Sequence, residues 1–244
     1  RNISRSTDCI CMKTKIQNEW EKDKAEDLEK QLSDLRQKIT HKLSEKRAAH
    51  ILAVEQMAVR IGQIYAPEKE MTLRAAALLH DITKELKKPE QLALCRQYGL
   101  VVTEQDLFTP KVFHARTAAA LIPSEYPAFA SDEIIGAVRW HTTGRRGMTL
   151  AEKIIYLADY IDDTRTYRDC VKLREMFWQA RFSEMTEEEK AEHLRKTLIC
   201  SFDYTVKGLL NDGDPVVTET FEARNDLILE ELRQKQSEKA KSKR

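Results

Sequence analysis

The chain has 244 residues, enough for one generous domain with appendages or at most two small domains. Charged residues make up 33% and the formal net charge is +1, so no molecule-wide field indicates a nucleic-acid or membrane partner. Only seven glycines and six prolines occur, a composition that favours helices over a sandwich or barrel. We therefore expect a single all-α domain.

The cysteines and the N-terminus bear on the compartment. Five cysteines without a CxxC pair do not fit the even disulfide framework of a secreted scaffold. No apolar run approaches the roughly 18 residues that span a bilayer, and the N-terminus is charged where a signal peptide is apolar. We expect a cytoplasmic protein. The chain opens on Arg1, and the sequence leaves open whether the native chain starts earlier.

Residues 1–40 are predicted to be a charged, amphipathic helical extension. Apolar residues recur in and just after it at spacings of three and four: Leu28, Leu32, Leu35, Ile39 and Leu43. The pattern spans about two heptads, fewer than the three or four that indicate a coiled coil. We expect this helix to lie on the domain, and a helix that pairs two chains into a homodimer is the alternative.

Apolar periodicity predicts further helices along the chain, over about 44–64, 71–79, 89–98, 114–122, 131–141, 149–162, 187–210 and 219–233. Ser44, Ser131 and Thr149 are candidate N-caps, and Glu152 completes a capping box with Thr149. Gly99 is the natural end of the helix that begins near Pro89.

Breaks in the pattern predict two irregular segments. Pro123 and Pro127 are expected to bracket a loop after the helix over 114–122. The basic stretch over 233–244 is expected to be a disordered tail.

Six polar residues stand at the ends or in the interiors of the apolar helices: His50, His80, Asp81, His114, His141 and Asp159. Any one such histidine is more often a hydrogen-bonded core residue, because an unpaired buried polar group costs about 1–3 kcal/mol. Together, imidazoles and carboxylates on separate rigid helices are what a divalent transition metal needs. A bound metal satisfies all of them at once.

The order of these residues resembles the HD superfamily of metal phosphohydrolases, whose signature is a His, a His-Asp pair and a distant Asp. His50, His80-Asp81 within LLHDITKEL, and Asp159 within YLADYID match it. Three segments narrow the resemblance to the YqeK family, the symmetrical diadenosine tetraphosphatases: LSEKRAAH at 43–50, RWHTTGRRGMTLAEKIIYLADYID at 139–162 and EARN at 222–225.

The resemblance implies an HD-domain helical bundle, over 41–232, with a dinuclear centre that cleaves diadenosine tetraphosphate into two ADP. The first ion would be held by His50, His80, Asp81 and Asp159. The second would be held by His114, His141 and a bridging Asp81, with hydroxide between the ions as the nucleophile. Iron is the metal that the family favours, and manganese or another divalent ion remains open. Two such cations can bring the pKa of a bridging water toward neutrality.

Basic groups are expected around the metals, because a polyphosphate spreads negative charge over its oxygens. Lys84 and Arg145 are the principal candidates for catalytic phosphate contacts. Further candidates for substrate binding are Thr142, Thr143, Gly144, Arg146, Arg165 and Arg224. Val217 stands where the family usually has a histidine, just before EARN, which puts a contact near the nucleotide in doubt.

Two other functions remain open at this point. The same metals with a different pocket would hydrolyse a nucleoside monophosphate, a deoxynucleotide or a guanosine alarmone. A non-catalytic nucleotide-binding domain is the other alternative, and the complete ligand set argues against it. A nucleic-acid-binding role is not indicated, because the sequence lacks the basic, aromatic surface that such binding needs.

Overall fold

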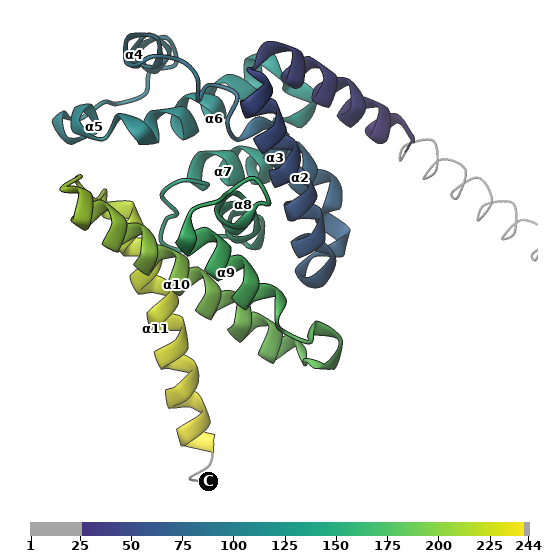
Figure 1. Cartoon of the computed structure of the whole chain (residues 1–244), viewed down its shortest axis with the longest axis vertical. Coiled ribbons are helices and arrows are strands. Elements are labelled where there is room, and N and C mark those ends of the chain that lie inside the picture. The colour runs from purple at the N-terminus through teal and green to yellow at the C-terminus, as the bar shows by residue number, and fades with distance from the viewer. Residues whose placement is uncertain (1–25, 242–244) are drawn as a thin grey trace, which may run out of the picture.

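The computed structural model describes residues 26–241, and within this range every regular element is a helix (Figure 1). The all-α prediction is confirmed. None of the helices in this range is both long and apolar enough to cross a bilayer.

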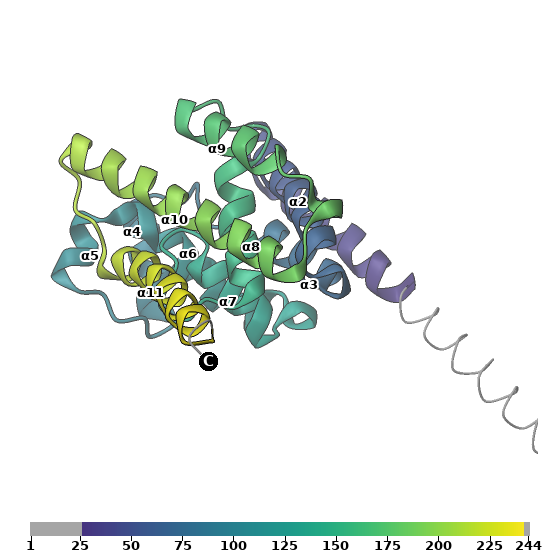
Figure 2. The same cartoon turned by 90° about the horizontal axis from the view of Figure 1, so that it is seen from below.

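Four helices form the centre of the domain: α2 (Glu45–Tyr65), α3 (Glu70–Leu79), α7 (Asp132–Trp140) and α8 (Leu150–Ile161). Figure 2 shows α8 enclosed by its neighbours. Its sequence is apolar on nearly every side, and eight of its twelve residues are buried, as expected of a helix in a core. Because α8 is packed on nearly every side, it can hold a polar side chain in a fixed position.

Helix boundaries follow the predicted capping residues. Ser44 accepts a hydrogen bond from the backbone N–H of Arg47 at the start of α2, and Ser131 caps α7 in the same way. Thr149 and Glu152 form a capping box at the start of α8. These side chains satisfy N–H groups that have no partner within the helix, so the start of each central helix is fixed locally.

Outer helices cover the centre on two sides. On one side α6 (Phe113–Glu125) packs on α7, and α4 (Lys88–Gln97) packs on α6. On the other side α10 (Glu187–Asp212) packs against α8, α9 (Arg168–Trp178) and α11 (Thr218–Lys241). The remaining elements are short: α5 (Glu104–Phe108), η1 (Pro67–Lys69), η2 (Pro110–Val112), η3 (Pro127–Phe129) and η4 (Phe182–Glu184).

The described part of the N-terminal extension is helical over residues 26–42. Leu32, Leu35 and Ile39 are at most 4% exposed and belong to the same core as the central helices. Arg36 also pairs with the buried carboxylate of Glu55 on α2 at 2.5 Å. The apolar stripe is thus used within the chain, which favours a helix laid on the domain over a dimerising helix. Residues 1–25 lie outside the described range.

Two predictions about irregular segments are wrong. Pro123 lies inside α6 rather than in a loop. Proline lacks the N–H that would donate to the carbonyl of residue 119, and the helix ends two residues later at Glu125, so this loss falls close to the end of the helix. The tail predicted to be disordered continues α11 to Lys241, because its glutamines, lysines, glutamate and alanine are good helix formers.

Two helices were absent from the sequence prediction. With five residues, α5 is too short to show a period. The 11-residue α9 buries Cys170, Leu173 and Phe177 at spacings of three and four, a helical pattern that its charged residues obscure.

Candidate metal centre

The six predicted ligands come from five helices that converge in the core. His50 lies on α2 and Asp159 on α8. His80 ends α3 and Asp81 follows it, His114 is in the first turn of α6, and His141 ends α7. The histidines are at most 8% exposed and Asp81 is 2% exposed. Helix ends therefore deliver four of the six side chains: His80, Asp81, His114 and His141.

Asp81 stands between two groups of histidines. Its Oδ2 lies 3.6 Å from the Nε2 atoms of both His50 and His80. Its Oδ1 lies 3.2 Å from Nε2 of His114 and 3.5 Å from Nε2 of His141. Each oxygen of one carboxylate therefore faces a separate pair of imidazoles, which is the arrangement of a carboxylate that can bridge two cations.

Asp159 completes the group on the Oδ2 side. Its Oδ1 lies 3.1 Å from Nε2 of His50 and 3.8 Å from Nε2 of His80. Asp162, which was not predicted, is fully buried and reaches Nδ1 of His50 at 3.4 Å. A carboxylate behind a ligand histidine orients the ring and raises its basicity. The signal for Asp162 was its place three residues after Asp159 in YLADYID.

Backbone contacts fix the orientation of two imidazoles. Nδ1 of His80 lies 2.6 Å from the carbonyl of Ala77, and Nδ1 of His141 lies 2.7 Å from the carbonyl of Val138. A carbonyl only accepts, so Nδ1 carries the proton and the lone pair of Nε2 faces the cluster. This is the tautomer that a metal requires.

Several buried atoms of the cluster have no hydrogen-bond partner: His50 Nε2, His80 Nε2 and Asp81 Oδ1. Leaving such atoms unpaired in a core is costly, and a cation within reach of all of them removes that cost. Overlapping sets of three residues each place their ligand atoms within 4.8 Å of one another. The residues present thus fit a divalent metal, with the mixed nitrogen and oxygen ligands of a transition-metal site.

Electrostatics of the cluster agree with ligation. Burial is the main cause that lowers the pKa of His80 to about 3 and the pKa of His114 to about 4. Both rings are therefore neutral near pH 7. Burial opposes ionisation of Asp159, yet the neighbouring Arg165 holds the pKa of that carboxyl well below its usual range. Burial also opposes a charge on His50, but the nearby carboxylates of Asp159 and Asp162 raise its pKa to about 9. A cation would therefore displace a proton from His50.

Three cationic side chains border the cluster. Nη1 of Arg47 lies 2.5 Å from Oδ2 of Asp81, and Nη2 of Arg165 lies 2.5 Å from Oδ1 of Asp159. Nζ of Lys84 lies 3.0 Å from Nε2 of His114 and 3.9 Å from Oδ1 of Asp81. Lys84 and Arg165 were predicted near the metals. Arg47 was missed, although its position one turn before His50 places it on the same face of α2.

Thr142 joins the cluster to a neighbouring cavity. Its Oγ1 lies 3.1 Å from Nε2 of His114 and 3.0 Å from Nε2 of His141. Thr142 and Thr143 both line a cavity of about 340 Å³. The hydroxyl of Thr143 is taken by the carbonyl of Gly144, so Thr143 contributes a wall rather than a free donor.

The structure does not bring the remaining predicted phosphate contacts to the cluster. The Arg145 guanidinium is held by the carboxylate of Glu152, 3.1 Å away, at the far end of α8 from Asp159. Arg146 is exposed and Arg224 pairs with Asp203. Their charges are therefore engaged elsewhere or lie in solvent.

Gly144 has a packing role instead of the predicted approach to phosphate. Its φ is +63°, and a Cβ there would lie 2.6 Å from Cζ of Phe202 and 2.9 Å from Cβ of Ala223. The glycine lets the loop after His141 pass close to α10 and α11.

Comparison with known proteins agrees with this geometry. The HD domain family matches residues 47–164, a range that holds all six residues of the cluster. A symmetrical bis(5'-nucleosyl)-tetraphosphatase from Staphylococcus aureus is 34% identical over 137 residues, 55% of this chain and 68% of the relative. The enzyme of the same name from Halalkalibacterium halodurans is 29% identical over 78% of this chain and 92% of its own.

A solved structure from the HD superfamily is also similar to this chain. The crystal structure of a predicted HD superfamily hydrolase involved in NAD metabolism, from Clostridium acetobutylicum, is 31% identical and superposes with a TM-score of 0.68. The matched region covers 81% of this chain and 97% of that protein. This chain belongs to the YqeK-like family of HD-domain hydrolases. For this YqeK-like hydrolase, the family and the His/Asp cluster together indicate a divalent metal centre.

Proposed function

We propose that this YqeK-like hydrolase cleaves diadenosine tetraphosphate symmetrically into two ADP. The observation that carries the proposal is the position of Asp81, whose two oxygens face two separate pairs of histidines. Two adjacent cations are the arrangement that clamps both the attacking and the leaving oxygen of a phosphoryl displacement. The names of the Staphylococcus and Halalkalibacterium relatives support a dinucleoside tetraphosphate as the substrate.

The ligands divide between two divalent ions. One ion would be held by His50, His80, Asp81 and Asp159, and the other by Asp81, His114 and His141, with iron as the first candidate. When bound, such ions polarise phosphoryl oxygens and activate water near neutral pH. Asp162 orients His50, and the backbone carbonyls behind His80 and His141 orient those rings.

The cations that now pair with the carboxylates of the cluster would be available to substrate if those carboxylates held metal. Arg47 and Lys84 contact Asp81, and Arg165 contacts Asp159. If these carboxylates ligate metal, each cation is attracted to them less strongly and can contact a phosphate oxygen instead. Arg47 and Arg165 offer planar, bidentate donors that suit phosphate. Side chains that hold the site together without substrate thereby become the substrate's charge partners.

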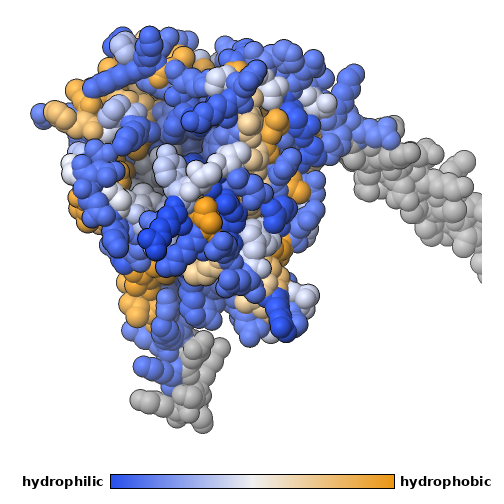
Figure 3. All heavy atoms as spheres, in the orientation of Figure 1, coloured by the Kyte–Doolittle hydropathy of each residue, from blue (hydrophilic) through white to orange (hydrophobic). Residues whose placement is uncertain are grey.

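The cavity beside Thr142 is the proposed seat of one nucleoside. Its walls are mainly apolar and include Phe108, Leu209 and Val217. Figure 3 shows hydrophobic side chains gathered at the end of the molecule that carries α5, where Phe108 is 69% exposed. Val217, which replaces a family histidine, lies in this wall, so a base would meet an apolar side chain there instead of a hydrogen-bonding one.

Product analysis tests the proposal. The metal-loaded protein is incubated with diadenosine tetraphosphate in oxygen-18 water, and products are followed by mass spectrometry. ADP as the sole product, with label confined to its terminal phosphate, is the expected result. Equimolar ATP and labelled AMP would contradict symmetrical cleavage and place the attack at an α-phosphorus.

A substrate panel and matched variants separate this function from the alternatives. NAD, a deoxynucleoside triphosphate, a nucleoside monophosphate and a guanosine tetraphosphate should be hydrolysed more slowly than diadenosine tetraphosphate. Asp159→Asn should abolish activity, whereas Asp163→Asn, at an exposed carboxylate four residues later, should not. Preference for another member of the panel would replace the substrate and keep the metal centre.

A further inference from the structure

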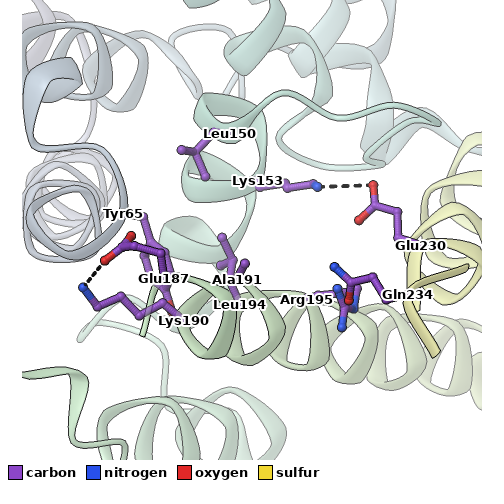
Figure 4. Close-up of a pocket in the computed structure, with 10 residues that line it drawn as sticks. All are labelled: Tyr65, Leu150, Lys153, Glu187, Lys190, Ala191, Leu194, Arg195, Glu230 and Gln234. Carbon is purple, nitrogen blue, oxygen red and sulfur yellow. Dashed lines mark hydrogen bonds and ion pairs between the residues drawn. The ribbon is translucent and has the colours of Figure 1, made fainter. Parts of the chain in front are cut away.

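A second cavity lies among α2, α8, α10 and α11, away from the metal cluster (Figure 4). Its volume is about 300 Å³. Lys153 of α8 lines it, six residues before Asp159, which corresponds to about 9 Å along a helix axis. The cavity shares no lining residue with the one beside Thr142, so it is a separate feature of the fold.

Arg195 of α10 lines this cavity and lacks a partner. The residue is 6% exposed, and its Nε is buried without a hydrogen-bond acceptor. No hydrogen bond or ion pair joins its guanidinium to any residue within 26–241. Of the three guanidinium nitrogens only Nε is both fully buried and unpaired, so the charged end of the side chain reaches the cavity. A largely buried charge without an ion-pair partner is stabilised when an anion binds beside it. The position of Arg195 therefore favours the binding of an anion.

The other charged groups of the cavity make its interior positive. Nζ of Lys153 lies 3.6 Å from Glu230, and Nζ of Lys190 lies 2.7 Å from Glu187. The lysine side chains are 19% and 20% exposed, whereas these glutamates are 38% and 81% exposed. Figure 4 shows Lys153 directed toward Glu230 and Lys190 toward Glu187 on the opposite side, with Arg195 facing the stretch of α11 that carries Glu230 and Gln234. The two lysines are thus deeper than their carboxylate partners. Arg195 forms no ion pair, and Glu192 and Glu231 act on it only through longer-range electrostatics.

We propose that this cavity binds a small phosphate-bearing anion, with Arg195 as its principal contact. A guanidinium presents a planar fork of donors that matches a phosphate group, and Lys153 and Lys190 can add charge at its sides. At about 300 Å³ the cavity is at the lower limit of ligand pockets, which suits inorganic phosphate or the phosphate end of a nucleotide better than a whole dinucleotide. The site is independent of which substrate the metal centre hydrolyses.

Calorimetric titration of the metal-loaded, full-length protein tests this site, with inorganic phosphate as one probe and ADP as the other. Wild type should show two classes of phosphate sites, one at the metals and one in the cavity. Arg195→Met should lose one class, and Arg195→Lys should keep it with affinity weakened about 10- to 100-fold. Lys196→Met is the matched control, because Lys196 is adjacent, exposed and outside the cavity. Cavity binding of phosphate alone, or of ADP as well, distinguishes the free ion from a nucleotide phosphate.

Thermal unfolding in phosphate-free buffer adds a readout with a defined sign. Arg195→Met should melt at or above the wild-type temperature, because it removes an unpaired buried charge, and it should gain less protection from phosphate than wild type does. Tungstate soaked into crystals should occupy the cavity beside Arg195 as well as the metal centre. A single class of phosphate sites in wild type, or two classes that survive Arg195→Met, would overturn the proposal. These results are read without measuring hydrolysis, so they stand apart from the proposed function.

Discussion

The guanidinium of Arg47 lies 2.5 Å from Oδ2 of Asp81, the same oxygen that faces His50 and His80. A strong cation and a metal would therefore compete for one carboxylate oxygen. The contact with Asp81 holds the Arg47 side chain beside the cluster. Its Nε is buried without a hydrogen-bond partner and is therefore an unused donor. This is the position of a group that stabilises the carboxylate without metal and contacts phosphate when metal is bound.

Arg47→Ala should lower turnover about 100- to 1000-fold, the usual cost of one preorganised charge contact in a transition state, and leave the metal content nearly unchanged. Arg47→Lys should recover part of the loss, because it keeps the charge without the planar fork. Arg60→Ala, at a more exposed position of α2, is the control. Steady-state kinetics and metal analysis of the same preparations provide the comparison. A loss below tenfold would place Arg47 outside the substrate's reach.

The position of Asp81 between two pairs of histidines predicts a difference between two ligand variants. Under the proposed dinuclear centre, Asp81→Asn should lose both ions after dialysis, because each oxygen of the carboxylate would serve one of them. His114→Gln should lose only the ion on the Oδ1 side, leaving about one ion per chain. Metal content per folded protein, measured alongside circular dichroism, gives the answer. Retention of one ion by Asp81→Asn would mean that the carboxylate serves a single metal.

Arg145 was predicted from the sequence to contact phosphate, and its contact with Glu152 now predicts a stability effect. Glu152 is 3% exposed, so Arg145→Ala leaves a buried carboxylate with one partner fewer, at a cost of about 1–3 kcal/mol. Turnover should change less than tenfold. Arg146→Ala, at the adjacent exposed residue, should alter the free energy of unfolding by no more than about 0.5 kcal/mol. Urea denaturation and kinetics of both variants decide between the two roles, and a catalytic loss without destabilisation would restore the original one.

The sequence predicted most of the fold and the metal cluster for identifiable physical reasons. Capping residues such as Ser44 and Thr149 act within one turn, so their effect is visible in a short stretch of sequence. Histidines and aspartates are unusual in apolar helices, so their presence on several such helices predicts that they share one site. Arg145 shows the limit: a basic residue near a motif has a partner that only tertiary packing selects, here Glu152.

His193 shows the same limit, and it carries a prediction about pH. In the sequence it stands among charged residues, a setting that is typical of a solvated side chain. It is half-buried, with its ring 5.1 Å from the rings of Phe177 and Phe182 and its Nδ1 3.2 Å from the Tyr65 hydroxyl. Burial lowers its pKa below 6.5. The unfolded chain then takes up the proton more readily, so His193 contributes stability above pH 6.5 that is lost as the pH falls toward its folded pKa.

His193→Gln in metal-loaded protein should therefore show a smaller drop in melting temperature between about pH 7.5 and about pH 5.5 than wild type shows. His41→Gln, at an exposed histidine, should follow the wild-type curve. The comparison uses the pH-dependent difference rather than the absolute melting temperature, because glutamine also loses ring packing at every pH. An unchanged difference in His193→Gln would assign the acid sensitivity to other groups.

Gly144 and Gly147 provide a matched pair in the loop that follows His141. Both have positive φ, +63° and +68°, but an added Cβ meets Phe202 and Ala223 at Gly144 and nothing within 4 Å at Gly147. Alanine at either position incurs the left-handed backbone penalty of about 1–2 kcal/mol, and Gly144→Ala should lose about 1–3 kcal/mol more from overpacking. Because Gly144 lies three residues after His141, its displacement should also weaken metal retention, which Gly147→Ala should leave intact. Chemical denaturation and metal analysis of the two variants test both effects, and equal losses would mean that the loop moves away from α10 and α11 at little cost.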